Sequence, residues 1–214
     1  MADSDLTEPE RIPLTLTEQT KTRRRGCVGL VVAVILGAAL GGLVGLLTNQ
    51  TAALATAAVV IVLLTGLSWI SARRRVWLEG DRVYAKALGR KSVDLRHAER
   101  IELLVTDIRG TRTIGLLVGA KNKTVNLPLA MYAGTGGREL GILVLRRLAD
   151  LFAGSGNTSG LVFSQLLVAQ LRAEAKGEAA AERPLYRLAS MAPAGRMAQR
   201  LKPEAVTRFV ATLD

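Results

Sequence analysis

Cysteine, histidine and aromatic residues are scarce in this chain, and their scarcity excludes several kinds of site. The 214 residues include one cysteine, Cys27, one histidine, His97, and only 4% aromatic residues. A single cysteine cannot form a disulfide within the chain, a CxxC redox pair or a cysteine-based zinc site. With one histidine besides, the usual His and Cys ligands of a metal site are also lacking. We therefore expect neither a metal ion nor a cofactor.

Motifs that bind nucleotides or activate a nucleophile are missing as well. The glycine-rich stretch 134–137 departs from the dinucleotide pattern GxGxxG because Glu139 stands where the last glycine would be, and no P-loop occurs. His97 has carboxylates nearby in the sequence, but no serine or cysteine in a recognisable elbow accompanies it, so we predict a surface turn there. An enzyme acting on a lipid or envelope precursor is the least favoured class, and no catalytic residue is predicted.

Charge is absent from a long internal stretch, which is the strongest signal in the sequence. No Asp, Glu, Lys or Arg lies between Arg25 and Arg73. As helices, residues 26–47 and 52–70 would each be about long enough for the ~30 Å hydrocarbon core of a bilayer, and the polar residues 48–51 separate them. We predict a transmembrane hairpin over residues 26–70. Buried helices of a soluble protein, or a signal peptide cleaved after Ala55, are the disfavoured alternatives.

The orientation of the hairpin follows from the charges at its ends. Arg23, Arg24 and Arg25 precede the first span, and an arginine triplet at 73–75 follows the second, whereas the connecting turn carries neither Lys nor Arg. Cytoplasmic flanks of membrane helices are enriched in Lys and Arg. The composition looks bacterial, so we expect a multi-pass protein of the inner (cytoplasmic) membrane with both termini in the cytoplasm.

The first span contains a face of small residues. Gly37, Gly41 and Gly45 recur every four positions, which is a doubled GxxxG pattern that lets another helix approach closely. The neighbour could be the second span, where Ala53 and Ala57 are also small and four apart. It could equally be the same helix of a second copy, and the sequence leaves both open.

The regions flanking the hairpin follow other patterns. Residues 1–25 lack hydrophobic periodicity and are predicted to be a disordered cytoplasmic tail. Residues 76–152 alternate polar and apolar positions in short segments between turns, with strands expected near 82–88, 92–95, 101–106, 113–118 and 124–127, and an amphipathic helix from about 137 to 152. The expected fold class is a membrane protein of the α+β type: a two-helix transmembrane hairpin, a small antiparallel β-sheet or barrel with a packing helix, and a helical tail.

The order of these features resembles a known family. Two apolar spans precede VWLEGDRVYAKALGRKSVDL, then come RIELLV, TIGLLVG and KTVNLPL, and a leucine-rich helix follows. This order is similar to that of bacterial pleckstrin-homology-like (PH-like) domains attached to membrane hairpins, over about residues 76–152. The resemblance implies a binding or scaffolding role rather than catalysis.

Residues 153–214 are predicted to be a linker followed by a helical, basic tail. The stretch GSGNTSG at 154–160 has the composition of a flexible linker, and helices are expected over 161–176 and from about Pro203. Whether this tail packs on the preceding domain or projects into the cytoplasm is left open by the sequence.

The basic excess lies entirely after the apolar block. Residues 1–25 carry as many acidic as basic groups, so the net charge of +11 arises beyond the hairpin. Such an excess suits an anionic inner leaflet, whereas nucleic acid is a disfavoured partner because no recognition motif or interleaved aromatic residues accompany the basic ones. The basic residues expected at the membrane surface are Arg23, Arg24, Arg25, Arg73, Arg74, Arg75, Arg82, Lys86, Arg90 and Lys91.

Two functional hypotheses follow. The first is a non-enzymatic integral membrane protein whose cytoplasmic PH-like domain recruits a partner protein or senses the anionic membrane surface. The alternative is a small accessory or assembly subunit of a larger membrane complex, docked through its glycine-rich first span. The expected partners are the lipid bilayer and either another protein or a second copy of the chain.

Overall fold

The structure is a computed structural model that describes residues 11–16, 20–47, 49–72, 75–86, 89–193, 195, 197–201 and 203–213. The chain divides into two compact units. One comprises Met1–Leu16, Arg75–Ala85 and Arg90–Asp214, and the other comprises Thr17–Arg74 and Lys86–Gly89. The described part has the α+β fold class expected from the sequence, with two antiparallel sheets and six helices.

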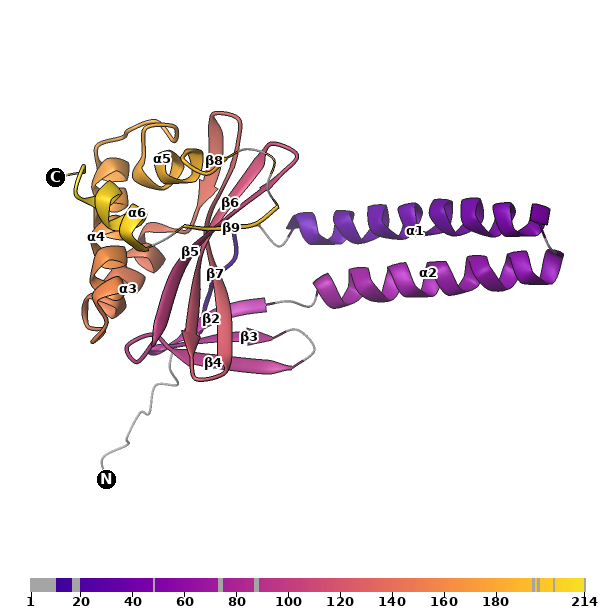
Figure 1. The fold of residues 1–214 in the computed structure, drawn as a ribbon, viewed down its shortest axis with the longest axis horizontal. Coiled ribbons are helices and arrows are strands. Elements are labelled where there is room, and N and C mark those ends of the chain that lie inside the picture. Colours follow the sequence, from indigo (N-terminus) through magenta and orange to yellow (C-terminus); the bar gives the residue numbers. More distant parts are fainter. Residues whose placement is uncertain are drawn as a thin grey trace, which may run out of the picture. The chain divides into compact units, whose positions relative to one another are not determined.

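The second unit is built on two antiparallel helices, α1 (Thr20–Leu47) and α2 (Gln50–Ala72), which contact each other along their length (Figure 1). Asn49 caps α2, because its side-chain Oδ1 accepts a hydrogen bond of 2.9 Å from the Ala52 backbone N–H. Both helices extend beyond the predicted spans 26–47 and 52–70. Within the described residues, Gln50–Leu67 is long and apolar enough to cross a membrane, whereas the apolar stretch of α1, Val31–Leu47, is shorter.

The first sheet has the strand order β1-β2-β3-β4. Its strands are β1 (Arg11–Pro13), β2 (Arg75–Glu79), β3 (Arg82–Lys86) and β4 (Arg90–Asp94). Along β2, buried side chains alternate with more accessible ones, as in a half-buried strand; Val76 and Leu78 are buried there, and Val83 is buried on β3. The tight turn between β2 and β3 depends on Gly80, whose φ of +60° is unfavourable for residues with a Cβ.

Strand β1 corrects the prediction that residues 1–25 are a disordered tail. Arg11–Pro13 pairs with β2 in the register Arg11↔Glu79 to Pro13↔Trp77, and the next residue, Leu14, is only 1% exposed. Residues 20–25 already belong to α1. The prediction was wrong for these segments because so short a strand has no periodicity of its own; it gains its hydrogen bonds from the edge of β2.

The second sheet has the order β8-β7-β6-β5-β9 and is antiparallel throughout. It contains the predicted strands at 101–106, 113–118 and 124–127 within longer elements. The five strands are β5 (Arg100–Ile108), β6 (Thr111–Ala120), β7 (Lys123–Ala133), β8 (Gly136–Glu139) and β9 (Gln199–Leu201).

Strand β8 also corrects the predicted helix over 137–152. Residues 136–139 pair with the end of β7, and Leu140 N–H then donates to the Leu129 carbonyl at 2.9 Å. The helix itself, α3, begins only at Ile142 and ends at Ala153. Its buried residues include Leu145, Leu148 and Phe152, spaced as an amphipathic helix requires, whereas Leu143 is 81% exposed.

The C-terminal region packs on the sheets, which resolves an alternative that the sequence left open. Helices α4 (Thr158–Ala175), α5 (Pro184–Ser190) and α6 (Pro203–Val210) follow α3, and strand β9 between α5 and α6 pairs with β5 (Figure 1). Phe163, Leu166 and Leu185 from this region join the same hydrophobic core as the strands. The predicted flexible linker 154–160 is shorter than expected, because Asn157 caps α4 by accepting a 2.9 Å hydrogen bond from Ser159 N–H.

Candidate functional site

The helical hairpin exposes aliphatic side chains around much of its described surface. Leu46 is 87% exposed and Leu47 is 79% exposed. No charged residue stands next to either of them in the sequence. Soluble monomers rarely expose contiguous apolar patches of more than a few hundred Å². The large exposed aliphatic residues of the hairpin are Val31, Val32, Val34, Ile35, Leu36, Leu40, Leu43, Leu46, Leu47, Leu54, Val59, Val62, Leu63 and Leu67.

The glycine face of α1 lies against α2. A Cβ added at Gly41 would approach the Ala53 carbonyl oxygen and the Ala57 Cβ to 2.8 Å, and one at Gly45 would approach the Ala53 Cβ to 2.9 Å. A Cβ at Gly37 would meet Ile61 Cγ1 at 2.5 Å. The structure thus brings the predicted small residues of the two helices together within one chain.

The predicted basic residues fall into three groups. Arg23, Arg24 and Arg25 are part of α1. Arg73 and Arg74 lie outside the described residues. The remaining five belong to the first sheet and are exposed, namely Arg75 on β2, Arg82 and Lys86 on β3, and Arg90 and Lys91 on β4.

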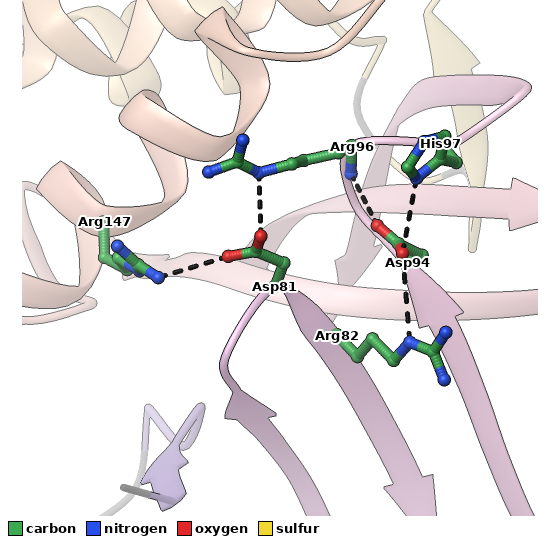
Figure 2. A network of polar contacts seen from close by, with 6 residues as sticks. All are labelled: Asp81, Arg82, Asp94, Arg96, His97 and Arg147. Carbon is green, nitrogen blue, oxygen red and sulfur yellow. Dashed lines mark hydrogen bonds and ion pairs between the residues drawn. The ribbon is translucent and has the colours of Figure 1, made fainter. Parts of the chain in front are cut away.

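At the β2–β3 turn, the acidic residues of the first sheet are paired with cations. Asp81 lies 2.8 Å from Arg96 Nε and 3.2 Å from Arg147 Nη2 of α3. Figure 2 shows these contacts beside those of Asp94. Since Arg147 belongs to α3, the Asp81 carboxylate links the turn to the helix that packs behind it.

Asp94 makes a second set of contacts in the same network. Its carboxylate lies 3.8 Å from Arg82 Nε and 3.3 Å from His97 Nδ1, and it accepts a hydrogen bond of 3.0 Å from the Arg96 backbone N–H (Figure 2). The His97 side chain is 83% exposed in a turn, as predicted. The network holds the ends of strands in place, and its carboxylates are already occupied by protein cations.

The opposite end of the same sheet is basic. Strands β2, β3 and β4 are neighbours in one antiparallel sheet, so the first residue of β2, the last of β3 and the first of β4 lie at one end. These residues are Arg75, Lys86 and Arg90. Among the described residues, none of these three forms an ion pair with an acidic side chain. The charges of the sheet are therefore segregated, with neutralised acids at one end and unneutralised cations at the other.

Two aromatic rings lie beside Arg90, a feature that the sequence did not reveal. Trp77 and Tyr84 stack with ring centroids 5.5 Å apart and an interplanar angle of 13°. The Arg90 guanidinium carbon lies 4.5 Å from the Tyr84 ring centroid and 5.9 Å from that of Trp77. The sequence signal was the alternation of these two half-buried aromatics with the buried Val76, Leu78 and Val83 on adjacent strands.

A second polar cluster lies inside the fold. Tyr132 of β7 donates a hydrogen bond of 2.6 Å to Glu139 Oε1 of β8, and Arg183 Nη1 donates to Glu139 Oε2 at 2.7 Å. Burial, then the hydrogen bond and the negative charge of Glu139, raise the pKa of Tyr132 far above its ordinary value. The phenol stays protonated and both carboxylate oxygens are occupied, so this cluster joins β7, β8 and the segment before α5 rather than offering a base.

The described part of the chain offers no cluster of metal ligands, and one of its grooves is polar. No group of three or more His, Cys, Asp or Glu within it could hold a metal ion. One polar groove of about 420 Å³ is lined by Arg172, Lys176 and Arg187 together with Glu178 and Glu182. Cations and carboxylates are mixed along its walls, so it presents no single charge to a ligand.

Comparison of the chain with protein-family models, with curated proteins and with solved structures gave no match. The resemblance to PH-like domains therefore stays a prediction from the sequence. Function has to be argued from the hairpin surface, the charged sheet and the order of the elements.

Proposed function

We propose that this chain is a non-enzymatic, two-pass protein of the bacterial inner membrane. In this proposal, α1 and α2 cross the bilayer as a hairpin. The α+β unit is a PH-like module on the cytoplasmic side, where it senses the anionic membrane surface and recruits a partner protein there.

The observation that carries the proposal is the surface of the hairpin. No charged residue occurs from 26 to 72, and the side chains that point away from the helix pair are mostly Leu, Val and Ile. Each such side chain gains roughly 1.5–3 kcal/mol when it is removed from water. A hydrocarbon environment around the helix pair removes all of these side chains from water at once. It costs no backbone hydrogen bonds, because these are already made within each helix.

The arginines at the two ends support one orientation. The triplets 23–25 and 73–75 flank the apolar block, and the turn between the helices is uncharged. Under the positive-inside rule both triplets lie in the cytoplasm. The α+β unit, which contains strands from before α1 and after α2, is then cytoplasmic too.

The order of the elements supports a binding module. Short antiparallel strands β2 to β8 are followed by the leucine-rich helix α3, which is the order on which the PH-like resemblance rests. That family implies recruitment or scaffolding, and the unneutralised basic end of the first sheet supplies a surface that suits an anionic leaflet.

The alternative, an accessory subunit docked through the glycine-rich span, loses its specific support. Its docking face was Gly37, Gly41 and Gly45, and these residues lie against α2. A partner in the membrane would need another face of the hairpin, for example around Gly42, where an added Cβ would meet nothing within 4 Å.

A topology experiment tests the membrane part of the proposal. A reporter that is active only outside the cytoplasm, inserted at Asn49, is expected to be active, whereas the same reporter fused after Leu213 is expected to be inactive. An inactive reporter at Asn49, or an active one after Leu213, would overturn the proposed orientation. Extraction of the protein from membranes by carbonate at high pH, without detergent, would overturn the membrane insertion itself.

Copurification tests the recruiting role. The tagged protein, solubilised from its native membranes, is expected to retain a cytosolic partner that is lost when the exposed basic end of the sheet is neutralised by Arg75→Gln and Lys86→Gln. Recovery of the protein alone and monomeric would contradict the recruiting role while leaving the topology intact.

A further inference from the structure

We propose that Trp77, Tyr84 and Arg90 form a contact site for the phosphate groups of anionic phospholipids, in the leaflet from which α2 emerges. This inference rests on the proposed membrane topology and deepens it, because it names the ligand and the side chains that bind it. The site lies on the outer face of the first sheet.

The three side chains form a pre-arranged cluster. The Trp77 and Tyr84 rings are nearly parallel at 5.5 Å, and the Trp77 indole Nε1 donates a hydrogen bond of 3.1 Å to Glu79 Oε2. That hydrogen bond fixes the orientation of the indole on the strand. Arg90 is exposed to solvent, but its guanidinium carbon lies 4.5 Å from the Tyr84 centroid. The stacked pair of rings therefore holds a cation whose long side chain would otherwise be free to move.

A stacked guanidinium suits phosphate particularly well. A guanidinium that lies over an aromatic ring can contact it through its planar face, which leaves the in-plane N–H donors available for oxygen atoms. Phosphate accepts two parallel N–H···O bonds from such a fork. Since no acidic side chain among the described residues pairs with Arg90, its charge is not already neutralised.

Chain connectivity argues for a membrane lipid as the source of the phosphate. Arg75, on the strand that carries Trp77, comes three residues after Ala72, the last residue of α2. A fully extended chain of that length covers only about 10 Å. Under the proposed topology, the chain therefore enters β2 within about that distance of the end of α2. Lipid phosphates lie at this level, and Trp and Tyr rings are enriched there because they combine an apolar body with a polar edge.

The charge distribution favours the same occupant. Arg75, Lys86, Arg90 and Lys91 gather at the end of the sheet that follows α2 in the chain. Glu79, Asp81 and Asp94 lie at the other end and are paired with cations. An anionic plane attracts such an arrangement and orients it, whereas an evenly charged sheet would gain no preferred orientation.

Fluorescence of Trp77 in the full-length protein tests the site. The chain has two tryptophans, so Trp69→Phe leaves Trp77 as the only indole. This protein is reconstituted into liposomes of phosphatidylcholine with or without phosphatidylglycerol, in which some lipids carry bromine near the headgroup end of the acyl chain. We expect Trp77 to be quenched in the anionic liposomes, less so in pure phosphatidylcholine, and less so again as the salt concentration rises.

Three substitutions test whether the cluster binds through its geometry or only through its charge. Arg90→Gln is expected to lower the ratio of docked to undocked protein by about fivefold, the effect of one basic group at an anionic surface. The matched control is Arg82→Gln, which removes the same charge from the same sheet at the end where Arg82 faces Asp94. The control should leave quenching unchanged, and Arg90→Lys, which keeps the charge without the planar fork, should fall between the two.

The outcomes distinguish this inference from the proposed topology. Equal quenching in anionic and zwitterionic liposomes, or equal loss in Arg82→Gln and Arg90→Gln, overturns the site while the reporter at Asn49 still supports the hairpin. If soluble glycerol phosphate lowers the quenching of Trp77 by brominated lipids in pure phosphatidylcholine, the site binds a free anion. That result would overturn the lipid assignment. If Arg90→Gln fails to fold, the salt dependence of the parent decides, because quenching that is insensitive to salt contradicts an electrostatic contact. Failure of the chain to enter liposomes at all would instead overturn the topology.

Discussion

Single residues fix the contact between strands β7 and β8. Tyr132 is only 2% exposed, and its ring fills the space next to Gly137 on the neighbouring strand. A Cβ at Gly137 would overlap this ring, with Cε1 at 2.7 Å and Cδ1 closer still. The φ of Gly137 is not in the left-handed region, so its backbone conformation does not require glycine. The close approach of the Tyr132 ring does.

Gly137→Ala is accordingly expected to destabilise the protein by about 1–3 kcal/mol, because the Tyr132 ring has to leave its position or the strands have to separate. Denaturant unfolding monitored by circular dichroism measures the change. Gly136→Ala is the control, since its Cβ would meet only the Ala133 carbonyl oxygen at 3.9 Å. Equal stability of the two variants would show that the ring is not confined.

The Tyr132 hydroxyl makes stability depend on alkaline pH. Burial, followed by the hydrogen bond and the charge of Glu139, raises the pKa of Tyr132, so the folded chain keeps a proton that the unfolded chain loses near pH 10. The folded state then binds more protons, and stability falls by about 1.4 kcal/mol for each pH unit above 10. Below pH 10 both states are protonated, and this contribution to the slope vanishes.

We predict that Tyr132→Phe removes this alkaline slope and also lowers stability at neutral pH by about 1 kcal/mol, because the hydrogen bond to Glu139 is lost. The free energy of unfolding, measured in urea from about pH 8 to pH 11, gives both quantities. Tyr186→Phe keeps Tyr132 and should retain the slope. A slope in Tyr132→Phe equal to that of the parent would rule out the assignment.

At the scale of elements, the two helices of the hairpin are held together by close packing. Glycines weaken an isolated helix by about 1 kcal/mol each, yet α1 contains several. Their use here is to let the backbone of α2 approach, as the contacts of Gly41 with Ala53 and Ala57 show. In a hydrocarbon environment, where apolar burial between helices gives little, such packing is a principal source of association.

Gly41→Leu is therefore expected to separate the helices and to cost about 1–3 kcal/mol. The unfolding temperature of the helical circular dichroism signal in detergent micelles should fall. Gly42→Leu adds the same side chain one position along, where nothing lies within 4 Å of the Cβ, and should leave that temperature nearly unchanged. A larger effect at Gly42 than at Gly41 would place the important helix contact on another face.

The longer elements could be predicted from the sequence, and the shortest ones could not. Strand β5 and most of β7 alternate buried and half-buried residues, and Ile114, Leu116 and Val118 of β6 keep the same period of two. The buried face of α3 repeats with the helical period. Strands β1, β8 and β9 have only three or four residues each. They exist because a neighbouring edge offers hydrogen-bond partners, and no local pattern reports that.

At the scale of the whole molecule, the C-terminal third belongs to the same core as the sheets. Phe163, Leu166, Leu185 and Leu188 are all nearly inaccessible to solvent. The polar composition of 154–160 suggested a separate tail, but the Asn157 amide Nδ2 donates to the carbonyl oxygens of Ala98 and Glu99 at 3.2 and 3.1 Å. The loop is thereby tied to the turn before β5, and α4 packs on α3.

A chain that ends at Ala153 is expected to lose its cooperative fold. It would expose the core face that α4 and α5 cover, and burying each large apolar side chain is worth about 1.5–3 kcal/mol against a total stability of only about 5–15 kcal/mol. Binding of a hydrophobic dye and loss of a cooperative urea transition are the measurements. Leu161→Ser, at a side chain that is already exposed, serves as a control and should unfold like the parent. A cooperative transition in the truncated protein would restore the boundary near residue 152.

The candidate surface was predictable only in part. The sequence identified Arg82, Arg90 and the other basic residues as a group, because charge content is a property of the residues themselves. It could not separate Arg82, which faces Asp94 at 3.8 Å, from Arg90, which stacks on Tyr84. That difference depends on which strands are neighbours, and so does the pairing of Trp77 with Tyr84.

The sequence by itself determined the uncharged helix pair, its basic flanks and the alternation of the long strands. These are features of neighbouring residues, and burial or exposure acts on them locally. The tertiary structure alone decided that the N-terminal segment joins the first sheet, that the C-terminal helices close the core, and that α2 fills the glycine face of α1. The reason is physical: hydrogen bonds at a strand edge, close helix packing and the neutralisation of a charge each require a partner from elsewhere in the chain, and only the folded molecule brings the two together.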